Sequence, residues 1–108
     1  MTWMLSTKHN NVISKSLFKD VDAYCKLRIE RVSIVQSNNE HVQFNVRKMI
    51  SEYVETQQKN GKIENFKIIC DKRNNNTASI AQGVKFEIIV IYKQTNCLRP
   101  TTLQYRLI

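Results

Sequence analysis

The 108-residue sequence predicts an α+β fold in which two helices pack on a small, mainly antiparallel three-stranded sheet. Apolar residues recur with helical spacing over residues 12–35 and again over residues 40–59, which is typical of helices with one buried face. Apolar and polar residues then alternate over residues 63–70, 84–92 and 101–108, which is typical of strands. Because a chain of this size buries roughly 65% of its unfolded surface, we expect a single domain, residues 1–108, with one modest core.

The first predicted helix runs from about Val12 to Val35, and Asn10 or Asn11 is its expected N-cap. Lysine and acidic side chains take the face opposite the apolar stripe. The β-branched residues at its end have lower helix propensity, so the helix is expected to fray or to end early there. The apolar stripe comprises Ile13, Leu17, Val21, Tyr24 or Cys25, Ile29 and Val32.

The second predicted helix begins near Glu40, after a polar break, with Asn38 or Asn39 as its N-cap. It ends near Lys59, and Gly61 follows where a left-handed C-terminal cap is expected. The capping signals at both ends make this helix the most strongly indicated element of the sequence. Its buried stripe comprises Val42, Val46, Met49, Ile50, Tyr53 and Val54.

Three strands follow the helices. In the first, residues 63–70, the side chains of Phe66, Ile68 and Cys70 share one face. The Asn-rich stretch 71–82 is too long for a tight hairpin, so we expect a flexible connection. The second strand, residues 84–92, is expected to be central and covered on both sides, because its second face carries two isoleucines. Those isoleucines are Ile89 and Ile91.

Both ends of the sequence are predicted to be extended. Residues 1–10 form a short arm, and residues 101–108, which follow Pro100, form a strand that reaches the last residue. A strand attached by one end can leave its own subunit and pair with a neighbour, because an added strand satisfies an open sheet edge. We therefore expect assembly by strand exchange. The intersubunit strands would comprise Thr2, Trp3, Met4 and Leu5 in the first arm and Thr101, Leu103, Tyr105 and Leu107 in the second.

The charge of the chain is unevenly distributed. Its net charge is +8, and residues 59–108 contain nine Lys or Arg against three Asp or Glu, which gives +6 for that half. Such a surface favours an anionic partner, either nucleic acid or an acidic protein face. The candidate contacts to that partner are Lys85, Lys93, Arg99 and Arg106.

Nucleic-acid binding is the main alternative function. Basic side chains, with Lys72 and Arg73 among them, could line one side of the sheet, and Tyr92 or Tyr105 could stack on a base. Both tyrosines are in step with the apolar residues of their strands, however, and this pattern favours a place in the core. No known nucleic-acid-binding motif is matched, so this function stays an alternative.

The sequence favours a protein that is not an enzyme. His9 and His41 are separated by the whole first helix, and neither lies beside a Ser or Cys in a nucleophile motif. Asp20 and Asp22 are two residues apart on a predicted helix, so they point to different faces and make a poor acid–base pair.

Cofactor, metal and membrane binding are also not indicated. The three cysteines are far apart in the sequence, which favours buried reduced thiols over disulfides or a zinc site. With two glycines in the chain, a glycine-rich phosphate loop is not formed. The sequence has no apolar stretch near 18 residues and no secretory signal at its start, so we expect no membrane span. The cysteines are Cys25, Cys70 and Cys97.

From the first helix onward, the order of elements resembles the C-terminal, tube-proximal domain of contractile phage tail sheath proteins. In that family a polar break joins two helices, and a glycine then leads into a strand that ends in Cys-Asp. Asparagines, a central strand and a terminal strand complete the domain. The matching features here are the break at residues 34–40, Gly61, the strand end Phe66-Lys67-Ile68-Ile69-Cys70-Asp71, Asn74, Asn75, Ile80 and Gln82-Gly83. The similarity covers about residues 17–108 and is most specific from Gly61 to Tyr92.

This resemblance implies a virion structural protein, assembled in the host cytoplasm as a sheath-like or tail-completion component of a phage tail. Sheath-like proteins exchange terminal strands between copies, and this domain lies nearest the tail tube. The implied partners are copies of the chain in a ring or helical array, together with tube, baseplate or neck proteins. The basic second half of the chain would then face an acidic tube.

The chain also departs from the family pattern. Its 108 residues correspond to the inner module alone, the apolar start of the interhelical break is altered, and the Asn run is longer than usual. Baseplate sheath initiators are similar in fold and in strand exchange, so they are a second alternative. They usually carry Glu-Pro-Arg before the first strand, where this chain has Asn60-Gly61-Lys62-Ile63.

Overall fold

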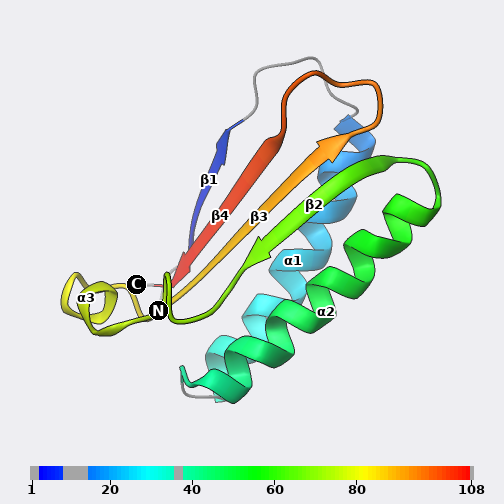
Figure 1. The fold of residues 1–108 in the computed structure, drawn as a ribbon. Coiled ribbons are helices and arrows are strands. Elements are labelled where there is room, and N and C mark those ends of the chain that lie inside the picture. Colours follow the sequence, from blue (N-terminus) through cyan, green and yellow to red (C-terminus); the bar gives the residue numbers. More distant parts are fainter. Residues whose placement is uncertain (1–2, 9–14, 36–37, 108) are drawn as a thin grey trace.

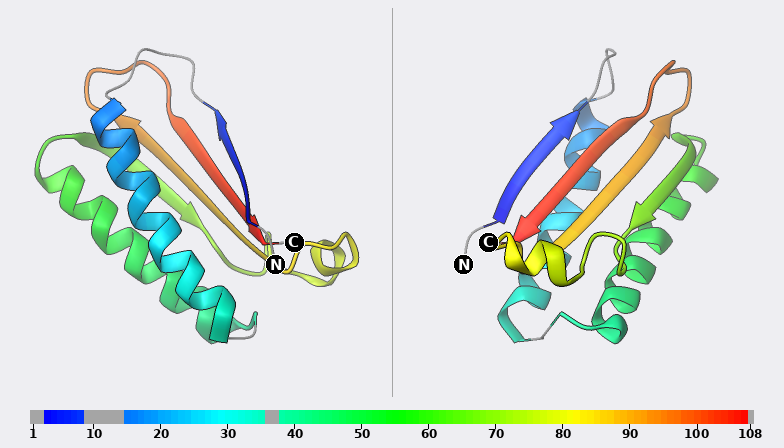
Figure 2. Two further views of the ribbon diagram at one scale, coloured as in Figure 1. Left: turned by 180° about the vertical axis from the view of Figure 1, so that it is seen from behind. Right: turned by 60° about the vertical axis from the view of Figure 1, so that its left-hand side comes forward.

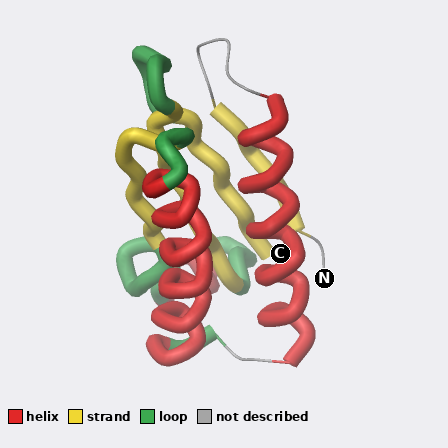
Figure 3. Tube along the Cα trace, turned by 90° about the vertical axis from the view of Figure 1, so that its right-hand side faces the viewer, coloured by secondary structure: helices red, strands yellow, loops and turns green. Residues whose placement is uncertain are grey.

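The computed structural model describes residues 3–8, 15–35 and 38–107. It confirms the α+β class, with two long helices on one face of an antiparallel sheet (Figure 1). Figure 3 shows both helices lying in front of the sheet, side by side. The elements in chain order are β1 (Trp3–Lys8), α1 (Lys15–Val35), α2 (Glu40–Lys59), β2 (Ile63–Ile69), α3 (Thr77–Ala81), β3 (Phe86–Gln94) and β4 (Thr101–Leu107).

The second helix forms where its capping signals place it. The side chain of Asn39 accepts a hydrogen bond from the backbone N–H of Val42 at 3.0 Å, as an N-cap does. At the other end Gly61 adopts φ +78°, a left-handed conformation that favours glycine, and its N–H donates to the carbonyl of Gln58. The N-cap residues expected for α1 lie outside the described residues. The buried residues of α1 and α2 are Leu17, Val21, Cys25, Ile29, Val42, Gln43, Val46, Ile50 and Val54.

The sheet has the strand order β1-β4-β3-β2, and every neighbouring pair is antiparallel. It contains the three predicted strands and a fourth, because the N-terminal arm pairs with β4 inside the same chain. The second predicted strand begins two residues later than expected. The N–H of Val84 instead donates to the carbonyl of Ser79, which closes the preceding turn, and the N–H of Lys85 donates to the carbonyl of Leu107 at the end of β4.

The core lies between the helices and one face of the sheet. That face contributes alternate residues of each strand, as the period-two pattern predicts. The face of β2 expected to hold Phe66, Ile68 and Cys70 is the inner one, with Phe66 partly buried at its margin. The inward-facing, buried residues of β3 and β4 are Phe86, Ile88, Val90, Tyr92, Thr101, Leu103, Tyr105 and Leu107.

The expectation that β3 is central is confirmed, but the two long helices lie on one of its faces and not, as expected of a strand covered on both sides, against both. Ile89 and Ile91 point away from the helices and are half-buried. On their side lies α3, beside the end of the sheet where β3 begins (Figure 1 and Figure 2). The two isoleucines led to the prediction that both faces of the strand are covered. An apolar composition alone does not distinguish burial under a second layer from partial burial among long polar side chains.

Candidate assembly surfaces

The N-terminal arm forms an edge strand of its own sheet. Six residue pairs align β1 with β4, from Trp3 opposite Leu107 to Lys8 opposite Thr102. The main contacts of β1 are with β4, since β1 lies at the edge of the sheet. Of the residues expected in this intersubunit arm, Trp3, Met4 and Leu5 belong to β1, and Thr2 lies outside the described residues.

The C-terminal strand has a different position. β4 lies between β1 and β3, so backbone pairing is satisfied on both of its sides. Its inward residues Thr101, Leu103, Tyr105 and Leu107, expected to contact a neighbour, are instead buried in the core of their own chain. The Tyr105 hydroxyl donates to Asp22 Oδ1 of α1 at 2.7 Å, which ties the strand to the helix layer. β4 is therefore an interior structural strand.

Two of the three cysteines are buried in this core. Burial raises the pKa of the Cys25 thiol to about 12, and it does the same for Cys70. Burial also raises the pKa of Tyr105, beside Cys25. Because the thiolate is the reactive form, both thiols are inert at neutral pH. None of the three cysteines, which all lie in the described part of the chain, is in a disulfide.

The four candidate cations fall at two ends of the sheet. The register places Arg106 and Lys85 beside the pair Phe86–Leu107, and it places Lys93 and Arg99 near the pair Tyr92–Thr101. These ends are separated by six residues of strand, roughly 20 Å. The structure therefore does not bring the four side chains together into one patch.

Two of these cations also have carboxylate partners within the chain. Arg106 Nε donates to Glu87 Oε2 at 2.5 Å, and the Lys93 ammonium group is paired with Glu64. Lys85 and Arg99 are exposed. An anionic partner would have to compete with Glu64 and Glu87 for Lys93 and Arg106, so the number of basic side chains overstates how many cations are available to it.

The Asn-rich connection is an ordered hydrogen-bond network, where sequence reasoning expected flexibility. Asn75 is buried; its Oδ1 accepts from the N–H of Glu87 at 2.8 Å, and its Nδ2 donates to the carbonyl of Glu87 at 2.9 Å. This side-chain amide replaces a backbone partner for β3 at a position just beyond the last pair of β2 and β3, Ile69 and Ile89. Asn74 Nδ2 adds a bond to the carbonyl of Ile69 at 3.0 Å.

The network continues to the turn between the two long helices. Asn38 Nδ2 donates to Asn75 Oδ1 at 3.1 Å and to the carbonyl of Lys85 at 2.7 Å. Gln43, which is buried, donates to Asn38 Oδ1 at 2.8 Å. The sequence signals for this network were the asparagines before α2 and the Asn run, but nothing in their spacing shows that they meet.

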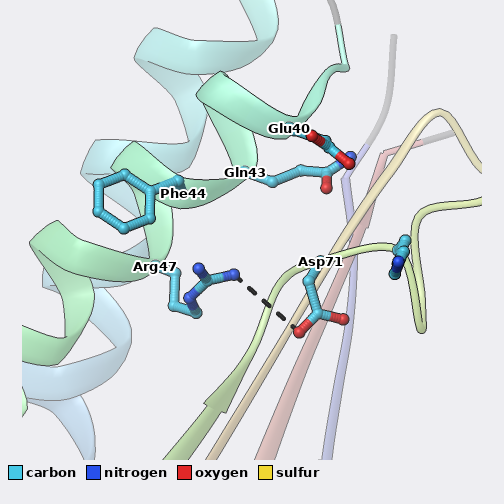
Figure 4. Close-up of a pocket in the computed structure, with 6 residues that line it drawn as sticks. Glu40, Gln43, Phe44, Arg47 and Asp71 are labelled. Carbon is cyan, nitrogen blue, oxygen red and sulfur yellow. Dashed lines mark ion pairs between the residues drawn. The ribbon is translucent and has the colours of Figure 1, made fainter.

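A pocket of about 320 Å³ opens beside this network, between the first two turns of α2 and the end of β2 (Figure 4). Arg47 Nη1 donates to the carbonyl of Cys70 at 2.8 Å and lies 4.0 Å from Asp71 Oδ2, and its guanidinium carbon lies 5.5 Å from the centre of the Phe44 ring. The pocket lining comprises Glu40, Gln43, Phe44, Arg47, Asp71 and Lys72.

Asp71, which lines this pocket, is ionised, and its negative charge is compensated by Arg73. Hydrogen bonds from the Arg73 side chain hold the pKa of Asp71 down to about 2, although partial burial of the carboxyl opposes this shift. Arg73 Nη2 lies 2.8 Å from Asp71 Oδ2. Asp71 is therefore a fixed anion with a bound cation, and it has no free proton to exchange at neutral pH.

Of the described residues considered for catalysis, Asp22 and His41 have partners elsewhere in the chain. Asp22 is occupied by Tyr105 and by Lys26, whose Nζ lies 3.0 Å from Asp22 Oδ2. His41 is exposed on α2 beside Asn45, and His9 lies outside the described residues. Within residues 3–8, 15–35 and 38–107, no three His, Cys, Asp or Glu side chains lie together as metal ligands would.

The two tyrosines considered for base stacking are buried, Tyr92 at 0% and Tyr105 at 2% exposure. Their rings are covered by the helices and cannot stack on a base. In the described part of the chain, neither long helix combines the length and apolarity needed to cross a membrane.

Comparison of the chain with protein-family models, with curated proteins and with solved structures finds no match.

Proposed function

We propose that this protein is a virion structural component, a sheath-like or tail-completion part of a phage tail, that assembles by exchanging β1 between copies around or next to the tail tube. The resemblance in element order to the C-terminal domains of sheath proteins supports a place in a phage tail. The edge position of β1, whose main contacts are with β4, supports the exchange.

The position of β1 is the observation that carries this proposal. If β1 of a neighbour takes the same place, all six residue pairs with β4 form again, so little pairing energy distinguishes the closed chain from the exchanged one. Such an exchange turns an edge strand into a link between subunits. Copies joined in this way produce a closed ring or an open helical array, depending on the rotation between them.

Of the two arms that the sequence predicted to be exchanged, the proposal keeps only the N-terminal one, β1. Residues 101–107 supply four buried side chains and pair on both sides, so donating β4 would dismantle the core of the donor. β1 pairs on one side only, so its departure leaves the β4–β3–β2 pairing in place.

The proposed partners are copies of the chain and an anionic surface of a tube, baseplate or neck protein. Lys85 and Arg99 are the exposed candidate contacts, one toward each end of the sheet. The alternative function of a baseplate sheath initiator is kept. Such a protein would use the same strand exchange at another position in the same particle. Localisation in the virion is part of the proposal.

Deleting residues 1–8 tests the proposed function. The deletion variant is expected to keep the helices and the β2–β3–β4 sheet, as seen by circular dichroism, and to lose oligomers in size-exclusion chromatography with light scattering. Oligomers of unchanged size after the deletion would contradict exchange of β1.

The same samples separate this function from nucleic-acid binding, which the net charge of +8 favours. The proposal predicts defined oligomers and only weak, salt-sensitive retention of DNA. A monomer that binds DNA in the nanomolar range at physiological salt would replace the assembly function with the alternative.

A further inference from the structure

The pocket at the start of α2 combines an exposed aromatic ring with basic side chains. Phe44 of α2 is 51% exposed and lines the pocket (Figure 4). The lining also includes Arg47 from the same helix and Lys72 from the connection that follows β2. A concave site with an apolar wall and a few placed charged groups is the usual arrangement for binding.

Arg47 keeps most of its positive charge available to a partner. The carboxylate of Asp71 accepts three hydrogen bonds from the Arg73 side chain, at 2.8, 3.0 and 3.1 Å, whereas Arg47 Nη1 lies 4.0 Å from Asp71 Oδ2. That separation is beyond hydrogen-bond distance. Arg47 is held instead by an uncharged acceptor, the carbonyl of Cys70, and its side chain is 33% exposed.

Glu40 is the other acid of the pocket lining, and it lies apart from Arg47. Positions 40 and 47 on α2 are nearly two turns apart, roughly 10 Å along the helix axis. In Figure 4 the Arg47 side chain points toward Asp71 and not toward Glu40. Because Arg73 compensates Asp71, Arg47 and Lys72 remain against one carboxylate, and the net charge of the lining is positive.

The pocket lies at the same end of the protein as Lys85, an exposed candidate contact to an anionic partner. Gln43, which lines the pocket, donates to Asn38 Oδ1, and Asn38 Nδ2 donates to the carbonyl of Lys85. Two hydrogen bonds therefore connect the pocket wall to the backbone of Lys85. One partner surface can reach both places.

We propose that this pocket receives a carboxylate side chain from an acidic segment of a protein partner. The carboxylate binds between Arg47 and Lys72, and an apolar neighbour in the same segment covers the exposed part of the Phe44 ring. A guanidinium and a carboxylate are both planar and match through paired hydrogen bonds. The inference rests on the proposed function, which includes an anionic protein partner, and it gives that partner a place on the chain.

The size and rigidity of the pocket favour such an occupant. Its volume of about 320 Å³ is at the low end of the range for ligand pockets, roughly 300–1,000 Å³, and suits one or two side chains. Arg47 is fixed by Cys70, and its guanidinium carbon lies 5.5 Å from the centre of the Phe44 ring. Groups held in place before binding lose less entropy when the partner arrives.

A short acidic peptide tests this site in the full chain. The probe is a capped, fluorescently labelled peptide Gly-Leu-Glu-Leu-Glu-Gly, and the control is the same peptide with Gln in place of both Glu residues. Fluorescence anisotropy at low salt measures the dissociation constants. The acidic peptide is expected to bind at least tenfold more tightly, because the neutral peptide cannot form charge-assisted hydrogen bonds.

Substitutions in the chain locate the binding. Arg47→Gln should weaken binding of the acidic peptide roughly tenfold, and Lys72→Gln, at an exposed residue, roughly threefold. Lys48→Gln is the matched control, because Lys48 is an exposed lysine of α2 outside the pocket lining and its loss changes the net charge equally. Lys48→Gln should leave binding unchanged, and circular dichroism should show folded protein in all three variants.

Three results would overturn the proposed site. They are equal affinity for the two peptides, equal effects of Lys72→Gln and Lys48→Gln, and no saturable binding up to about 1 mM acidic peptide. A single-stranded DNA oligonucleotide that binds more tightly than the peptide and loses affinity in Lys72→Gln but not in Lys48→Gln would assign the pocket to nucleic acid instead.

The deletion of residues 1–8 separates this inference from exchange of β1. Peptide binding that persists in the deletion variant and still depends on Lys72 supports the pocket even if β1 is not exchanged. If the chain forms oligomers through β1 but binding does not depend on Arg47 or Lys72, only the pocket proposal fails.

Discussion

The first and last strands of the sequence lie side by side in the sheet, but they are held in different ways. β4 has a strand on each side, buries four side chains and reaches α1 through the bond from Tyr105 to Asp22. β1 has a strand on one side and is aligned through β4. Nearness to a chain end therefore does not decide how a strand is held: β4 is fixed by pairing on both sides and by buried side chains, whereas β1 is paired on one side.

The largest expected effect is a difference in stability between substitutions at paired residues of the two strands. Leu103 on β4 is fully buried and lies opposite Thr7 of β1. Leu103→Ala should lower the free energy of unfolding by about 2–5 kcal/mol, since it removes buried methyl groups and leaves a cavity. Thr7→Ala should cost at most about 1 kcal/mol, the span of strand propensities.

Urea denaturation of both variants measures the difference. Equal losses of stability would mean that β1 is as much a part of the core as β4, and the distinction between the two strands would be lost.

A smaller effect is expected at the Asn network, which holds the start of β3 on the side where its pairing with β2 has ended. Asn75→Ala leaves the buried N–H of Glu87 without its side-chain partner, while the carbonyl of Glu87 keeps the bond from Asn74 Nδ2, and we expect a loss of about 1–3 kcal/mol. Hydrogen exchange should show faster exchange of the Glu87 amide in this variant.

Asn65→Ala is the matched control, because Asn65 is exposed on β2, and its effect should stay within about 0.5 kcal/mol. If both substitutions cost the same, the side-chain amide of Asn75 does not replace a strand partner.

Local sequence signals predicted the helices and the faces of the strands well. The N-cap at Asn39, the left-handed Gly61 and the alternation through β4 each depend on neighbouring residues only, and each is confirmed. These features follow from backbone geometry, which acts within a few residues of the chain.

Contacts between distant residues were not predictable in the same way. The pairing of β1 with β4, the bonds from Asn38 and Asn75, and the pocket beside Phe44 each join segments that are far apart in the sequence. The charge count failed for a related reason: it could not show that Arg106 and Lys93 pair with Glu87 and Glu64.

Exchange of β1 is tested most directly by cross-linking a mixture of isotopically heavy and light copies. Ser6 and Gln104 lie opposite each other on β1 and β4, so Ser6→Cys with Gln104→Cys, in a Cys97→Ser background, places two thiols across that pair. After joint refolding, assembly and cross-linking, mass spectrometry reads whether the 6–104 peptide pairs join two heavy, two light or one of each. For equal amounts of heavy and light protein, exchange predicts that mixed pairs are as abundant as the two kinds of pure pairs together. Pure heavy and pure light pairs alone, from protein that is assembled, would contradict it.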